Sequence, residues 1–146
     1  MRSLLGGVLV LGLVLVSGCG SSDSTGPTRA SVAGSWTMSV RNLTDGGGVI
    51  CSGADINVTL TGSGTTFSGT YNGVIACVAS GGGGESFPTS GTVVNGVWSG
   101  TQVAFDLDDT RVHYVGTLGG STMEGSETYH FSDGSVLTGY WSATRK

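Results

Sequence analysis

Charged side chains are scarce in this chain. They make up 11% of its 146 residues, with 6 basic against 10 acidic, and the net charge is −4 at pH 7. A chain this poor in lysine and arginine offers no basic patch to neutralise phosphates. Nucleic-acid binding is therefore excluded as a class of function.

Catalytic motifs are missing as well. The abundant serines include no Gly-x-Ser-x-Gly elbow, and the glycines at 81–84 are not followed by the Lys-Ser/Thr of a phosphate loop. His113 and His130, the only histidines, fall on the polar face of predicted strands at offset register positions, so the pattern predicts no metal pair. We expect a protein that is not an enzyme and that needs no metal or cofactor.

Long hydrophobic runs are limited to one, from Leu4 to Val16, which follows the positive Arg2. This run is too short for a membrane-spanning helix but suits the core of a secretory signal peptide. The sequence thus predicts a leader over residues 1–18.

The residues that end this leader, Val16-Ser17-Gly18-Cys19, consist of an aliphatic residue and two small residues before a cysteine. They resemble the lipobox of bacterial lipoproteins. The resemblance implies cleavage before Cys19, a diacylglycerol on its thiol and an acyl chain, typically palmitate, on its new amine. Two or more acyl chains give stable membrane anchoring. Because Gly20 rather than aspartate follows the cysteine, we expect an extracytoplasmic lipoprotein on a bacterial outer membrane, in the periplasm or at the cell surface.

The mature chain divides into two parts. Residues 19–32 comprise the lipidated cysteine and a small, polar, turn-rich stretch that is typical of a flexible tether. Residues 33–146 form one domain of ordinary size. With Cys19 lipidated, Cys51 and Cys77 remain, and an even pair in an oxidising compartment predicts a disulfide.

The domain shows alternating apolar and polar residues between turn signals and no helical periodicity. Eight strands are predicted over 35–42, 51–62, 65–79, 89–98, 101–107, 110–118, 121–131 and 136–145. With Ser63-Gly64 as a two-residue turn, Leu60 opposes Phe67 on one face, and the same scheme applied along the chain keeps one face apolar.

The same pairing scheme places particular side chains inside. Val94 opposes Phe105, Glu127 opposes Val112, and Phe131 opposes Leu137. One bulge residue at Asn72-Gly73 aligns Cys51 with Cys77.

Eight antiparallel neighbours with one buried face form either a closed barrel or a sandwich. Inward glycines opposite large side chains favour an all-β, eight-stranded up-and-down meander barrel. Gly34-Ser35-Trp36 near the start and Arg145 near the end resemble the lipocalin and avidin-like (calycin) group. This resemblance implies that Arg145 covers Trp36 and closes one end of the barrel.

The connections predict two unlike ends. Short turns gather at the closed end, whereas 43–50 and 80–88 make a loop-bearing mouth that faces away from the tethered end. Inward Glu127 is a candidate polar anchor for a ligand, or it is held internally by Arg145 or by tyrosines. The ligand-binding candidates are Tyr71, Tyr114, Glu127, Tyr129 and Trp141.

Two functions remain open from the sequence. One is a membrane-anchored protein that binds a small apolar or aromatic ligand in the barrel. The other is a structural or protein-interaction module of the envelope with a filled core and no ligand. The volume left inside the barrel decides between them.

Overall fold

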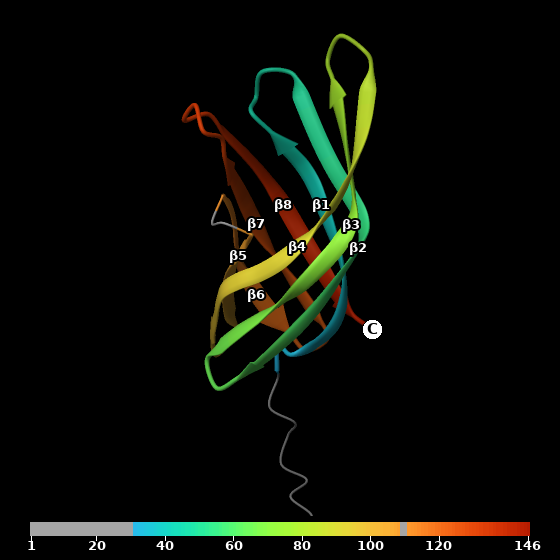
Figure 1. The fold of residues 1–146 in the computed structure, drawn as a ribbon. Helices are drawn as coiled ribbons and strands as arrows, with labels where there is room; N and C mark the ends of the chain where they lie inside the picture. Colours follow the sequence, from blue (N-terminus) through green and yellow to red (C-terminus); the bar gives the residue numbers. More distant parts are fainter. Residues whose placement is uncertain (1–30, 109–110) are drawn as a thin grey trace, which may run out of the picture.

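The computed structural model describes residues 31–108 and 111–146. Eight antiparallel strands follow one another around a closed barrel (Figure 1). They are β1 (Gly34–Thr44), β2 (Val49–Ser63), β3 (Thr66–Ala79), β4 (Gly84–Ser99), β5 (Gln102–Leu107), β6 (Val112–Gly119), β7 (Thr122–His130) and β8 (Val136–Arg145). The predicted all-β up-and-down barrel is confirmed, and the sandwich alternative is wrong. The leader, Cys19 and the tether up to residue 30 lie outside the described residues.

The barrel closes through a ladder between β1 and β8 that runs from Trp36↔Arg145 to Thr44↔Thr138. One end of the barrel, here called the tight end, carries the β2–β3, β4–β5 and β6–β7 turns and both ends of the domain. The opposite end, the loop end, carries the other four connections. This division agrees with the one predicted.

The predicted pairings of the hairpins are wrong by two residues. Leu60 pairs with Gly69 instead of Phe67, and Glu127 pairs on β6 with Tyr114 instead of Val112. On its other side, Glu127 pairs with Gly139 of β8. The cause lies in the turns, where Gly64, Gly100 and Gly120 take the first of the two loop positions with φ of 66°, 61° and 66°. A glycine with positive φ at that position is the pattern of a type II′ turn. Because side chains alternate with a period of two, a slip of two leaves the predicted faces unchanged.

Two side chains predicted inside the barrel are not there. In β4 the register shifts between Val94 and Val97, where Asn95 has a φ of 53°, so Val93 points inward instead of Val94. Phe131 lies beyond the end of β7 and is 42% exposed. A bulge and an early strand end are local departures that alternation alone does not reveal.

Cys51 and Cys77 are cross-strand partners joined by a disulfide, as predicted. The bulge that aligns them lies in β2 between Ala54 and Asn57, where Asp55 has a φ of 56°, and not at Asn72-Gly73. The bridge therefore ties β2 to β3 above the body of the barrel.

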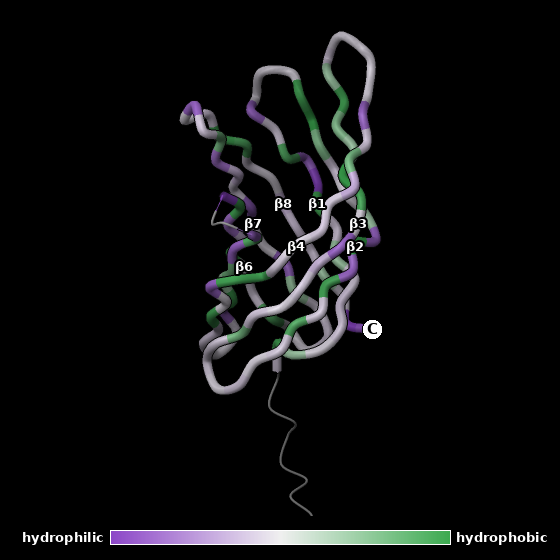
Figure 2. The backbone as a smooth tube through the Cα atoms, viewed as in Figure 1, coloured by the Kyte–Doolittle hydropathy of each residue, from purple (hydrophilic) through white to green (hydrophobic). Residues whose placement is uncertain are grey.

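The barrel is taller on one side. Strands β2, β3 and β4 have 15, 14 and 16 residues, whereas β5, β6 and β7 have 6, 8 and 9. Since β4 begins at Gly84, most of the predicted loop 80–88 is a tall hairpin, and the β1–β2 and β3–β4 hairpins rise above the rest (Figure 1). Apolar residues continue into these hairpins (Figure 2). Those exposed to solvent there are Val49, Ile50, Val74, Val78 and Phe87.

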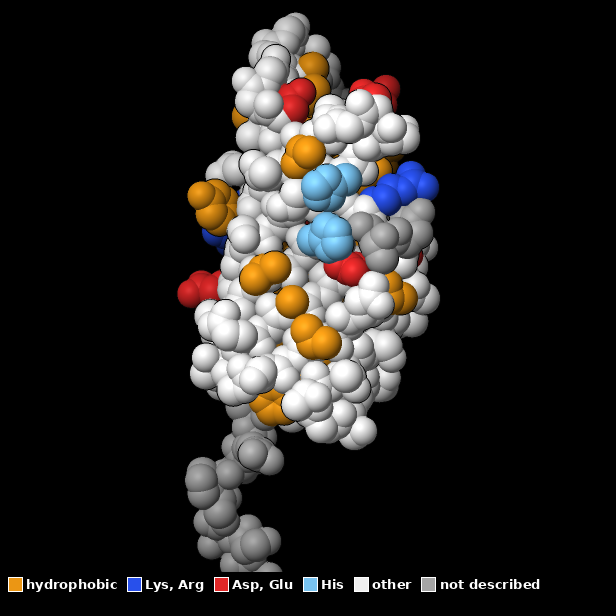
Figure 3. Space-filling view, turned by 90° about the vertical axis from the view of Figure 1, so that its left-hand side faces the viewer, with side chains coloured by type: hydrophobic (Ala, Val, Ile, Leu, Met, Phe, Trp, Pro, Cys, Tyr) orange, Lys and Arg blue, Asp and Glu red, His pale blue; other side chains and the backbone are white. Residues whose placement is uncertain are grey.

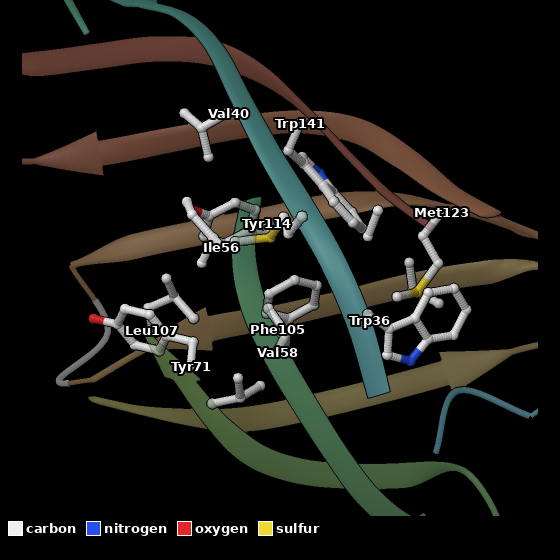
Figure 4. Close-up of a cluster of buried hydrophobic side chains, with 14 of the residues drawn as sticks. Trp36, Val40, Ile56, Val58, Tyr71, Phe105, Leu107, Tyr114, Met123 and Trp141 are labelled. Carbon is white, nitrogen blue, oxygen red and sulfur yellow. The ribbon is translucent and has the colours of Figure 1, made fainter. Parts of the chain in front are cut away.

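The interior of the barrel body is filled by side chains (Figure 4). Phe105 and Tyr114 stack with ring centres 4.8 Å apart and planes 2° from parallel. Trp141 meets the Phe105 ring edge-on at 5.3 Å, and Phe67 does so at 5.9 Å. Such offset and edge-on arrangements are the favoured geometries of aromatic pairs.

Trp36 and Arg145 lie together at the tight end. Trp36 is fully buried and its indole N–H donates to the carbonyl of Val32 at 2.9 Å. The guanidinium of Arg145 lies 4.3 Å from the centre of the Trp36 ring and donates to the carbonyl of Ala33 at 2.7 Å and to that of Ser31. Val32 is itself 2% exposed and packs at this end of the barrel.

The disulfide is expected to stabilise the barrel through the unfolded chain. It closes a loop with a sequence separation of 26, which corresponds to about 3–4 kcal/mol of free energy of unfolding on the chain-entropy model. Replacing both Cys51 and Cys77 by serine should lower the free energy of unfolding by that amount in urea titrations. Reductant should destabilise the parent protein similarly and leave the double variant unchanged; equal sensitivity of both proteins would contradict the prediction.

Candidate functional site

A depression opens at the loop end over the short side of the barrel, and we call it the mouth depression. Its volume is about 530 Å³. It is lined by Thr92, Leu107, Asp108, Arg111, Val112 and Tyr129. Leu107, Val112 and Tyr129 are inward-facing residues at the loop-end limits of the short strands β5, β6 and β7. Leu107 is buried, and Val112 and Tyr129 are half-buried.

Asp108 lines one side of the mouth depression and is fixed there by hydrogen bonds. Its carboxylate accepts hydrogen bonds from the Tyr71 hydroxyl at 2.6 Å and from the Thr92 backbone N–H at 3.0 Å. Its own N–H donates to the Thr92 carbonyl at 2.8 Å. Asp108 adopts a left-handed φ of 53°, and its carboxylate lies against Gly91, where a Cβ would be 1.9 Å from Oδ1. Asp108, the first residue after β5, is thus fixed to β3 through Tyr71 and to β4 through Thr92.

Tyr71 is the buried partner of this carboxylate. Burial and the hydrogen bond to Asp108 raise the pKa of Tyr71 to about 12. The phenol therefore stays protonated at neutral pH and remains a donor. Tyr71, a predicted ligand candidate, acts on the mouth depression through Asp108.

Tyr129 lines the mouth depression directly. It is half-buried, and its ring meets the exposed Phe131 ring edge-on at 4.7 Å. The opposite charges of Asp108 and Arg111 face the same space. The arrangement offers an apolar and aromatic wall beside one anion and one cation, which suits a small amphipathic molecule.

Glu127, Tyr114 and Trp141 lie beneath the mouth depression in the packed interior. Glu127 is 1% exposed, between Tyr114 and Gly139. Neither of its carboxyl oxygens has a hydrogen-bond partner among the described residues. Burial raises the pKa of Glu127 to about 7, and the nearby Tyr114 hydroxyl, which makes no hydrogen bond of good geometry to the carboxyl, offsets part of this rise. Burial disfavours the charged form of a carboxyl group, so a substantial fraction of Glu127 is protonated at neutral pH.

The remaining two candidates have structural contacts. Burial and the neighbouring Glu127 raise the pKa of Tyr114 well above its usual value. The indole N–H of Trp141 donates to the carbonyls of Ser126 at 3.1 Å and Val115 at 3.3 Å. Of the five predicted ligand candidates, the structure brings Tyr129 to the mouth depression and Tyr71 to its wall.

The other charged and polar lining residues were not singled out from the sequence. Asp108, Arg111 and Thr92 were not among the predicted site residues. Their role depends on the left-handed turn at Asp108 and on the early end of β5, which no motif marks.

Two further site classes are absent from the part of the chain that is described. Residues 31–108 and 111–146 contain no group of three or more His, Cys, Asp or Glu side chains arranged to hold a metal ion. Within the same ranges no helix is long and apolar enough to cross a membrane.

The buried carboxyl of Glu127 predicts a pH-dependent stability. Its folded pKa of about 7 lies above the unfolded value of 4.5, so the folded state binds more protons between these values and stability falls as pH rises through them. The full cost, present above pH 7, is about 3 kcal/mol.

A Glu127→Gln variant should therefore match the parent near pH 4.5 and exceed its free energy of unfolding at pH 8. Urea titrations across this range measure the difference, with the exposed Glu124→Gln as control. A parent whose stability does not fall between pH 4.5 and 8 would contradict the assignment.

Comparison with known proteins adds no family to this picture. No protein-family model, no curated protein and no solved structure matches the chain.

Proposed function

We propose that this protein is a lipid-anchored binding module of the bacterial envelope that takes a small amphipathic ligand, aromatic or aliphatic, in the mouth depression. The observation that carries the proposal is the depression of about 530 Å³ with Tyr129, Leu107 and Val112 on one side and Asp108 and Arg111 on the other. Ligand sites are concave and carry convergent polar groups beside apolar walls; here three of the six lining residues, Thr92, Asp108 and Arg111, are polar or charged.

The packed interior restricts where this ligand binds. Phe105, Tyr114 and Trp141 occupy the middle of the barrel, and eight-stranded barrels are just wide enough to be filled by side chains. The ligand is therefore held at the rim, above Glu127, and not in the centre of the barrel.

The lipobox-like Val16-Ser17-Gly18-Cys19 supports the anchor. The described chain enters the barrel at the tight end, where Ser31 and Ala33 are bound by Arg145 (Figure 1). A lipid on Cys19 would then hold the tight end toward the membrane and turn the mouth depression away from it.

A second function is favoured by a separate observation. The filled core and the exposed apolar side chains of the tall hairpins, such as Ile50, Val78 and Phe87, suit a module that contacts another protein. Contiguous exposed apolar surface is a common mark of interaction sites. The first function predicts binding at the mouth depression, over the short side of the barrel. The second predicts binding at the tall β1–β2 and β3–β4 hairpins.

Anilinonaphthalene sulfonate, which has aromatic rings and one anionic group, is a probe that separates the two. If the mouth depression binds it, Tyr129→Ala and Arg111→Gln should each weaken the fluorescence titration about five- to tenfold, as expected for losing about 1–1.4 kcal/mol of aromatic or ionic contact. The matched control is Phe87→Ser on the β3–β4 hairpin. Weakening by Phe87→Ser alone would refute the mouth site and favour the interaction surface.

Acylation of Cys19 is tested separately. Mass spectrometry of the membrane fraction should find the mature N-terminal peptide beginning at Cys19 with its thiol and amine acylated. Cys19→Ser should leave an uncleaved, unacylated precursor that retains the apolar leader, whereas Ser17→Ala, which keeps a small residue, should be cleaved and acylated like the parent. An unmodified thiol at Cys19 would exclude the anchor.

A further inference from the structure

The two histidines of the chain lie side by side on the outer face of β6 and β7 (Figure 3). His113 belongs to β6 and His130 ends β7, and their ring centres are 5.6 Å apart with planes at 78°. The offset register had suggested that they do not meet. They do meet because diagonal neighbours on adjacent antiparallel strands are within reach of long side chains.

His113 is oriented by a carboxylate. Its Nδ1 is hydrogen-bonded to Oδ1 of Asp106 on the neighbouring strand β5. The other oxygen of Asp106 accepts a hydrogen bond from the Asn95 side-chain amide at 2.8 Å. Asn95 reaches this position from the bulge of β4, where its φ is 53°. Asp106 is 9% exposed, so the pair is shielded on its inner side.

This chain of contacts fixes the chemistry of the imidazole. An ionised carboxylate only accepts hydrogen bonds, so the Nδ1 of His113 donates and its Nε2 carries the lone pair. The lone pair of Nε2 is therefore directed away from Asp106. Histidines that bind metals in proteins almost always donate their other ring N–H to a carboxylate, carbonyl or water in this way.

The spacing of the two rings also suits a metal. Two imidazoles on one zinc ion, each with a Zn–N bond of about 2.0–2.1 Å, hold their ring centres roughly 5 Å apart. The observed 5.6 Å is close to this value, and both side chains are exposed to solvent, so the rings have room to turn.

We propose that His113 and His130 form a two-histidine site for a divalent transition metal of the zinc and copper class, with Asp106 and Asn95 as positioning residues behind His113. Imidazole suits these metals, and copper binds such nitrogen sites more tightly than zinc. Water completes the coordination on the open side. The site is on the outside of the barrel and does not depend on the mouth depression.

The test is a titration of the purified full chain carrying Cys19→Ser, which is not acylated at residue 19 and has no cysteine thiol there to compete for the ion. Calorimetry with Zn²⁺ and Cu²⁺ should show one ion per chain, with copper bound more tightly. Electron paramagnetic resonance of the Cu²⁺ complex should show coupling to two nitrogen nuclei. Binding of neither ion would overturn the proposal, and so would coupling to fewer than two nitrogen nuclei.

Variants separate ligation from a purely structural histidine pair. His113→Ala and His130→Ala should each abolish one-to-one binding, and Asp106→Asn should weaken it about 10- to 100-fold, the usual effect of losing a residue that orients a metal ligand. Glu124→Gln, which removes an exposed carboxylate from the same outer face of β7, is the matched control and should leave the affinity unchanged. Circular dichroism checks that each variant is folded. If folded His113→Ala and His130→Ala proteins bind both ions as the parent does, the site is excluded.

Discussion

Closure of the sheet between β1 and β8 is the constraint on which the rest of this structure depends. Once eight strands close, the interior is just wide enough for side chains, and its volume is no longer adjustable. Aromatic rings from β3, β5, β6 and β8 fill the body, and Trp36 with Arg145 fills the tight end. Any larger ligand must then be held at the rim or on the outside, which is where both candidate sites are found.

Close strand approach makes this filling feasible. Gly116 and Gly125 are cross-strand partners, and a Cβ on Gly125 would lie 1.9 Å from the Val115 carbonyl oxygen. The Trp141 ring lies against this bare backbone and donates its N–H to carbonyls on β6 and β7. The same absence of side chains at Gly139 leaves room for the carboxyl of Glu127, 3.0 Å from where a Cβ would be. Glycines on the inner face thus determine which large side chains fit and where a buried acid is tolerated.

The sequence was sufficient to predict the faces of the strands, except at the β4 bulge and the end of β7, but not their alignment. Glu127 and Tyr129 were correctly placed inside because a two-residue slip preserves alternation. The slip depends on whether Gly64 is the second residue of its two-residue turn, as predicted, or the first, as observed. Hairpin turns accept a glycine at either position, so the sequence pattern could not choose between the two alignments. Asp108 and the His113–His130 contact depend on a left-handed residue and on sheet twist, which appear only when the strands are assembled. The lipobox rests on the sequence alone.

The end of β5 shows how little chain separates the two candidate sites. Phe105 points into the aromatic core, Asp106 points outward to His113, and Leu107 points inward to the mouth depression. Asp108 then leaves the strand with its left-handed φ and binds Tyr71. Alternation assigns each residue of this segment to one side of the sheet, so a charge or ligand at Asp106 is separated from Leu107 by the backbone itself. A site on the outer face can therefore change its chemistry without disturbing the packing that closes the barrel, provided that the β4 bulge still delivers Asn95 to Asp106.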